Sequence, residues 1–201
     1  MRRAYPYQVL VWHEIVNDVF SDQPLLITYC PLCGTGIVFE REIDGERVTF
    51  GVSGRLYNSD MLMYDRKTDS LWSQITGQAV VGELTGTRLT LYPSEIMTWR
   101  DWQGAYPDSE VLTTDTGYTR EYGLDPYPGY YTSDSIWFPV SDTDDRLFAK
   151  ERITGIELAG PVYGAYPDNV IIEHGPVNDL LGDTLLLIVA DQQAGNSVRV
   201  F

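Results

Sequence analysis

Two cysteines separated by two residues form the clearest chemical motif in the sequence. They stand in Cys30-Pro31-Leu32-Cys33-Gly34, and they are the only two cysteines of the chain. A disulfide that closes so short a loop would add little stability, because the stabilisation grows with loop length. Thiolates are also ligands for soft metal ions. The motif therefore indicates a functional pair of thiols more than a structural crosslink.

The residues that follow Cys33 help to separate the possible uses of this pair. In thioredoxin-like proteins the motif opens a helix, whose N-terminus lowers the thiol pKa. Here Gly34-Thr35-Gly36 leads into residues 37–41, whose apolar and β-branched character predicts a strand. Pro31 restricts the turn and Gly34 tolerates a positive φ, a combination that favours a metal knuckle. A redox pair and two incidental core thiols stay open as alternatives.

A closed tetrahedral metal site needs two ligands beyond the two sulfur atoms. The sequence has only two histidines, and imidazole is a common ligand of both zinc and copper. We therefore expect a two-Cys, two-His ligand set, made of Cys30, Cys33, His13 and His174. The alternative for each histidine is an ordinary side chain that binds no metal.

Two methionines are weaker ligand candidates. Met61 and Met63 are two positions apart in a predicted strand, so their side chains share one face. Thioether, thiolate and imidazole ligands together favour copper, although methionines at this spacing usually belong to a core. The expected cofactor is thus a copper or zinc ion, with iron as a further alternative.

Composition limits the classes of function. The formal charge is −15, which disfavours nucleic acid as a partner because a negative surface repels phosphate. Carboxylates are abundant and only two of the basic residues are lysines, which suits a protein kept soluble at high salt, or a GC-rich coding bias. The longest apolar run, residues 185–190, is too short to cross a bilayer, so we expect no transmembrane segment.

Two parts of the chain, residues 4–30 and 165–191, match each other without a gap. They share Ala-Tyr-Pro, a histidine, Val-Asn-Asp and a later apolar run, so that position 13 corresponds to position 174. We interpret the match as an internal duplication. In each copy the proline is expected at a helix start, a short helical or irregular segment is expected to carry the histidine and to end at Asn-Asp, and a buried strand is expected to follow.

The rest of the pattern predicts one mostly-β domain with a few short helices, of the α+β class, over residues 1–201. An Asp-Gly turn at 44–45 predicts a hairpin, and a helix is expected at 94–103 with Ser94 as its N-cap. The second copy is preceded by two predicted strands that turn at 159–161. The first copy has no such lead-in, so we expect the N-terminus to be truncated relative to a complete fold. Further strands are predicted at 60–64, 70–74, 79–81 and 88–91.

Residues 115–145 form a long segment rich in Tyr, Asp and Pro. Five of its tyrosines stand among Pro, Gly and Asp, a composition that predicts a loop: Tyr118, Tyr122, Tyr127, Tyr130 and Tyr131. Ordered long loops in compact domains often carry function. We expect this loop to be a lid on the sheet, a flap over the site, or a surface that binds a partner.

Several longer motifs carry a resemblance to a known family. They are Trp12 to Asp18, Thr28 to Thr35, Gly51 to Gly54, Tyr57 to Asp60 and Leu71 to Gln74. With these motifs the chain resembles the domain-of-unknown-function 3179 family, whose members are prokaryotic, some from salt-loving archaea. The resemblance covers nearly the whole chain, and it supports the positions His13, Cys30 and Cys33 without giving them a role. Members are often exported or lipid-anchored, so the resemblance implies an extracytoplasmic location, whereas the first residues of this sequence predict no signal peptide.

Three kinds of function fit these observations. The first is a metal-binding protein that serves electron transfer or metal handling. The second is an enzyme, either a thiol–disulfide oxidoreductase or a metal-dependent oxidase or hydrolase, with Cys30, Cys33 and Glu14 as catalytic candidates. The third is a non-catalytic module that binds a partner through the loop at 115–145. The sequence leaves the substrate, the partner and the oligomeric state open.

Overall fold

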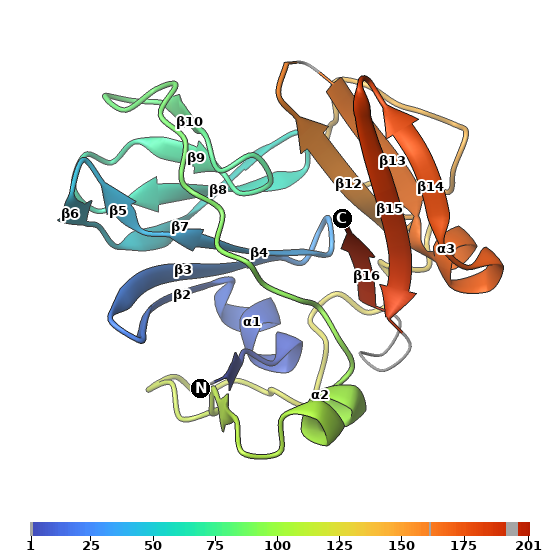
Figure 1. Cartoon of the computed structure of the whole chain (residues 1–201). Helices are drawn as coiled ribbons and strands as arrows, with labels where there is room; N and C mark the ends of the chain where they lie inside the picture. Colours follow the sequence, from blue (N-terminus) through green and yellow to red (C-terminus); the bar gives the residue numbers. More distant parts are fainter. Residues whose placement is uncertain (1, 161, 192–196) are drawn as a thin grey trace. The chain divides into compact units, whose positions relative to one another are not determined.

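The structure is a computed structural model in which residues 2–160, 162–191 and 197–201 are described (Figure 1). Strands outnumber helices among these residues, which confirms the mostly-β prediction. The chain groups into two compact units. Unit one holds residues 3–94 and 110–145, and unit two holds Arg2 with residues 95–109 and 146–201. Whether the two units together make one domain stays a prediction.

The first sheet of unit one contains the cysteine turn at one end. Its strands are antiparallel and are β2 (Ile15–Phe20), β3 (Gln23–Cys30) and β4 (Thr35–Glu40). The expectation that a helical or irregular segment ends at Asn17-Asp18 before the strand begins is wrong, because both residues lie inside β2. The Asn17 side chain bonds the main-chain N and O of Phe50, at 2.7 and 2.9 Å, and this pairing holds it in the strand. The same correction applies to Asn178-Asp179 in β14 (Val177–Leu181).

The second sheet of unit one has the order β10-β9-β8-β7. A small hairpin of β5 (Glu42–Ile43) and β6 (Glu46–Arg47) precedes it, and its turn residues Asp44 and Gly45 have φ of 52° and 77°, as an Asp-Gly turn requires. The four strands are β7 (Phe50–Tyr57), β8 (Asp60–Asp65), β9 (Leu71–Ser73) and β10 (Ala79–Val81).

The strand predicted at residues 88–91 does not form. Arg88 makes an isolated bridge with Gln78, and Leu91 makes another with Phe39 of β4. These bridges lead to two different sheets, so this segment crosses from one sheet to the other and cannot continue a ladder with either.

Strand β3 is buried on both faces, which explains its continuous apolar sequence. On one face, Leu26 and Cys30 belong to a core cluster with aromatic side chains of the second sheet, among them Phe50 and Trp72. On the other face, Leu25, Ile27 and Tyr29 pack with residues of the helix α1 (Tyr7–His13). Figure 1 shows α1 and strands β7 to β10 on opposite sides of this sheet. Each such burial contributes about 1.5–3 kcal/mol per large apolar side chain.

Helix α1 has only seven residues, too few to be stable by itself. Pro6 forms its N-cap with extended backbone, and the helix ends at Glu14, whose φ is 60°. Val9 and Leu10 are buried, so packing against β3 supplies the stability that the helix lacks. His13 therefore sits in the last turn of a helix that the core holds in place.

Unit two also contains a short helix that precedes an antiparallel sheet. Strands β12 (Ile153–Leu158) and β13 (Val162–Pro167) form the expected antiparallel pair, while Pro161 of the expected turn lies outside the described residues. Helix α3 (Asp168–His174) follows, and Ile171 on it packs against the next sheet. That sheet has the order β14, β15 (Thr184–Asp191) and β16 (Ser197–Val200).

The helix predicted at 94–103 is shifted towards the C-terminus. Helix α2 (Trp99–Ala105) has Thr98 as its N-cap, and the Thr98 hydroxyl accepts a hydrogen bond from the backbone N of Asp101. The prediction that Ser94 is the N-cap is thus wrong, because Thr98 accepts a hydrogen bond from one of the free N–H groups in the first turn of the helix. In the described ranges, no helix is long and apolar enough to span a membrane.

The segment from 112 to 152 contains neither helix nor strand. It follows β11 (Glu110–Val111), which pairs in parallel with β1 (Arg3–Ala4). Contacts within unit one hold parts of the segment: Ser141 N and Oγ donate to Asn58 Oδ1 at 3.0 and 2.8 Å. The loop at 115–145 is therefore tied to the end of β7.

Candidate metal centre

The cysteine motif forms the turn of the hairpin between β3 and β4. Cys30 is the last residue of β3 and pairs in register with Thr35, the first residue of β4. Gly34 has the expected positive φ of 65°, and its N donates to the Cys30 carbonyl at 2.8 Å. A strand follows the turn, as the sequence predicted, so no helix N-terminus acts on the thiols.

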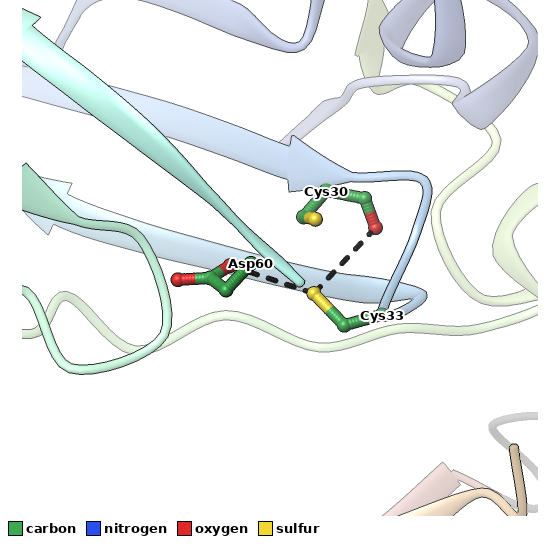
Figure 2. Close-up of side chains that lie close together, drawn as sticks. All are labelled: Cys30, Cys33 and Asp60. Atoms are coloured by element: carbon green, nitrogen blue, oxygen red, sulfur yellow. Dashed lines mark hydrogen bonds between the residues drawn. The ribbon is translucent and has the colours of Figure 1, made fainter. Parts of the chain in front are cut away.

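Three potential ligand atoms meet at this turn. Figure 2 shows the side chains of Cys30, Cys33 and Asp60 pointing toward one region, and their ligand atoms lie within 4.8 Å of one another. Cys33 Sγ is 3.5 Å from Asp60 Oδ1. Both cysteines are free, and among the described residues this is the single group of three His, Cys, Asp or Glu side chains so arranged.

Asp60 is the residue that sequence reasoning did not select as a ligand. It begins β8 directly after a tight turn at Asn58 and Ser59, which both have positive φ. An Asn-Ser turn before a strand is readable in the sequence, but the pairing that brings this strand to the cysteine turn is not. The Tyr57 to Asp60 motif was the one available signal.

The carboxylate of Asp60 is held in one orientation. Its Oδ2 atom accepts hydrogen bonds from Ser73 Oγ and from Ile75 N, both at 3.1 Å. Oδ1 is thereby left facing Cys33. Asp60 is 4% exposed, and burial raises the pKa of its carboxyl group. A cation beside Oδ1 would offset this cost of burying the charged form.

The two thiols have different surroundings. Cys30 is buried and accepts hydrogen bonds from Cys33, including its backbone N–H, and from the backbone N–H of Met61. The side-chain hydrogen bond from Cys33 lowers the pKa of Cys30, although burial opposes that shift. The same bond, followed by burial, raises the pKa of Cys33. The hydrogen bond between the two sulfur atoms thus favours the thiolate form at Cys30 and the thiol form at Cys33.

His13, in the same unit, is not a member of this group. His13 Nε2 lies 2.7 Å from Tyr122 OH, and the His13 ring is 5.7 Å from the rings of Tyr118 and Tyr122. Burial lowers the pKa of His13, with a further contribution from Arg120. His174 ends α3 in unit two. A ligand role for either histidine stays a prediction.

The remaining candidates also have defined places. Met61 and Met63 are buried in the same core cluster as Cys30. Glu14 accepts a hydrogen bond from Tyr29 N through its carbonyl at 2.8 Å, and burial raises the pKa of its side chain. Thioether ligation by the methionines and acid–base chemistry at Glu14 stay predictions.

Part of the tyrosine-rich loop lies beside the cysteine pair. Tyr130 is 2% exposed, and burial raises the pKa of its phenol, with further contributions from Cys30 and Cys33. Tyr131 makes a side-chain hydrogen bond with Tyr29, the neighbour of Cys30. A ligand that reached the thiols would therefore meet phenol groups.

Comparison with known proteins gives a family and no activity. A family profile described as "Protein of unknown function (DUF3179)" matches residues 1–200. The chain belongs to this family. Neither a curated protein nor a solved structure matches it. For this DUF3179 member, the site geometry is therefore the basis for any functional conclusion.

Proposed function

We propose that unit one binds a divalent metal ion of the zinc type through Cys30, Cys33 and Asp60. The observation that carries the proposal is the convergence of two sulfur atoms and one carboxylate oxygen within 4.8 Å, from two separate turns. Thiolate with carboxylate is a donor set that borderline-soft ions accept.

The separation of the donor atoms supports the same conclusion. Zinc bonds of about 2.3 Å to sulfur and about 2.1 Å to oxygen place S and O about 3.6 Å apart in a tetrahedron. Cys33 Sγ and Asp60 Oδ1 are 3.5 Å apart. The pair therefore needs little movement to share one ion.

Charge favours a dication over a monocation. Two thiolates and a carboxylate together carry three negative charges, and both Cys30 and Asp60 are buried. Burying net charge is unfavourable, so an ion that cancels two charges is better tolerated than Cu⁺, which cancels one. Copper stays the alternative, and electron transfer would require it because zinc has no redox chemistry.

Three protein ligands leave one tetrahedral position for a water molecule, a substrate or a fourth side chain. His13 and His174 stay the predicted candidates for a fourth ligand. An open position is typical of catalytic zinc sites, whereas four protein ligands are typical of structural ones. Metal handling and metal-dependent catalysis are thus separated by the identity of the fourth ligand.

Metal analysis tests the proposal. Protein purified anaerobically with reductant is expected to hold about one metal ion per chain after reconstitution with Zn²⁺. Cys33→Ser and Asp60→Asn are expected to lose it. Asp22→Asn is the matched control, because Asp22 is exposed in a turn with φ of 66°, which Asn tolerates. Absence of zinc, copper and iron from the reconstituted protein would refute metal binding.

A thiol–disulfide enzyme is the second candidate, favoured by two free neighbouring cysteines of which Cys33 is exposed. Its difficulty is that the thiol with the lowered pKa is Cys30, which is 1% exposed and out of reach of a bulky disulfide. Reversible oxidation by glutathione disulfide, with mixed disulfide trapped at Cys33 in a Cys30→Ser variant, would support this candidate.

We also propose that residues 4–30 and 165–191 are copies of one structural unit. Each begins a seven-residue helix after a proline, and each continues into an antiparallel hairpin. Tyr5 OH donates to Asp18 Oδ2 at 2.6 Å, and Tyr166 OH donates to Asp179 Oδ2 at 2.8 Å. These two bonds join equivalent positions.

A further inference from the structure

Gln74 is a fully buried polar side chain next to the proposed site. It follows β9, and all its side-chain polar atoms have partners. Its Nε2 donates to Thr28 Oγ1 at 2.9 Å and approaches the Thr35 carbonyl at 3.4 Å. Its Oε1 accepts from Thr35 Oγ1 at 2.8 Å. Burying an amide is unfavourable unless such bonds are made, so the residue needs an explanation.

The chemistry of the partners determines which way the amide faces. The Thr35 carbonyl oxygen can only accept, so the amide atom beside it must be nitrogen. The Thr28 hydroxyl donates its proton to the Ile37 carbonyl at 2.7 Å, so its oxygen accepts from the same nitrogen. Oε1 of Gln74 is thereby left to face Thr35.

The orientation of the Gln74 amide also fixes the direction of the hydrogen bond between Thr35 and Cys33. Thr35 gives its one hydroxyl proton to Gln74, so its oxygen can only accept from Cys33 Sγ, which lies 3.1 Å away. Two other neighbours of this sulfur are also acceptors: Asp60 Oδ1 at 3.5 Å and the Cys30 carbonyl at 4.0 Å. The Cys33 sulfur is thus bordered by three oxygen acceptors, in addition to the Cys30 sulfur to which its S–H also donates.

We propose that Gln74 is a positioning residue, which through Thr35 presents an acceptor to Cys33 and so directs its sulfur atom towards Asp60. The functional meaning of this hydrogen-bond chain rests on the proposed metal site. A cation that replaces the Cys33 proton enters a place already lined by acceptors. The chain runs from the Cys33 thiol through Thr35, Gln74 and Thr28 to the Ile37 carbonyl in β4.

A purely structural role is the rival explanation. Gln74 N also donates to the Met61 carbonyl at 3.1 Å, so the residue links the two sheets of unit one. If this is its whole role, removing the hydrogen-bond chain lowers stability and leaves the geometry at Cys33 unchanged. The test therefore needs a readout at the sulfur atom.

Substitution of Thr35 provides that readout. Binding of Co²⁺, followed by its sulfur-to-metal charge-transfer band, is expected to weaken about 10–100-fold in Thr35→Val, with a shifted band. Thr35→Ser, which keeps the hydroxyl group, is expected to restore both. Thr49→Val is the matched control, because Thr49 is exposed outside the site. Equal affinity and an equal band in Thr35→Val and Thr49→Val would overturn the proposal.

Nuclear magnetic resonance of the reduced, metal-free protein tests the chain independently of metal. The hydroxyl protons of Thr28 and Thr35 are expected to exchange slowly, with the Thr35 proton close to Gln74. Gln74→Met is expected to abolish the slow Thr35 signal, while Gln78→Met, outside the chain, retains it. A Thr35 proton directed at Cys33 in the wild type would overturn the inference. Wild-type protein with this chain but no Co²⁺ uptake would refute metal binding alone.

Discussion

Residues 4–30 and 165–191 build similar local structures in different surroundings. In both, a proline precedes a seven-residue helix that ends at a histidine, and a hairpin follows. In the first copy, Leu26 of β3 is 0% exposed, because the second sheet covers that face. At the equivalent position of the second copy, Leu187 is 38% exposed. Leu185, two positions earlier in β15, is 81% exposed.

The candidate site needs the second sheet of unit one, which covers β3, in addition to the segment 4–30 that resembles 165–191. The first copy ends at Cys30, where the second has Asp191. Asp60 and Gln74 come from the β7–β10 part of unit one, which adds the proposed third ligand and the hydrogen-bond chain. The repeated helix and hairpin thus provide a support, and the covering sheet completes the site.

The largest expected loss of stability comes from shortening a buried leucine in the core of unit one. Leu26→Ala is expected to lower the free energy of unfolding by about 2–5 kcal/mol, because it leaves a cavity between two layers. Leu187→Ala is expected to cost under about 1 kcal/mol, since the side chain is partly exposed. Hydrogen exchange of amides in β3 and β15 measures both. Similar losses in the two variants would show that the copies are equally covered.

Removal of metal should affect unit one alone. At an ion concentration of about 100 times Kd, binding adds about 2.7 kcal/mol to the stability of the folded state. We expect chelation or Cys30→Ser to remove this increment, as seen by denaturant unfolding with and without Zn²⁺. Asp191→Asn, at the equivalent position of the second copy, should leave the increment intact, because Asp191 lies in unit two, where it pairs with Arg199, and is not among the three proposed ligands.

The paired tyrosines give a smaller contrast. Tyr5→Phe removes a hydrogen bond to Asp18 that is partly buried and shared with Arg3, so we expect a loss of about 1–2 kcal/mol. Tyr166→Phe removes the equivalent bond to Asp179 at an exposed place, and the expected loss is below about 0.5 kcal/mol. Chemical denaturation of both variants measures these losses of unfolding free energy. A larger loss for Tyr166→Phe than for Tyr5→Phe would contradict the prediction.

Acid should weaken the first copy through Asp18. Burial acts to raise the pKa of Asp18, but hydrogen bonds from Tyr5 and Arg3 outweigh it, and the net pKa is lowered from its ordinary value. Because the folded state favours the carboxylate, this contribution is present above about pH 4 and is lost as the pH falls through the lowered pKa. The unfolding free energy of Asp18→Asn, measured from about pH 5 to pH 2, should fall less than that of the wild type.

Local patterns foretold the β class, the Asp-Gly hairpin, the strand after Cys33 and the positive φ of Gly34. They failed where two local signals competed. Ser94 and Thr98 are both good N-caps, and Thr98 forms the bond to Asp101 that starts α2. Asn17 favours turns in isolation, but its side chain pairs with the main chain of Phe50, a residue distant in sequence.

The sequence by itself determined the thiol pair, because Pro31 and Gly34 shape a turn through their own backbone preferences. It also indicated a short helix after Pro6 and after Pro167, since proline favours the first positions of a helix. The tertiary structure alone decided that Asp60 meets Cys33 and that Gln74 meets Thr35. Such meetings depend on how strands pair across long stretches of chain, and no residue encodes that pairing through its neighbours in sequence.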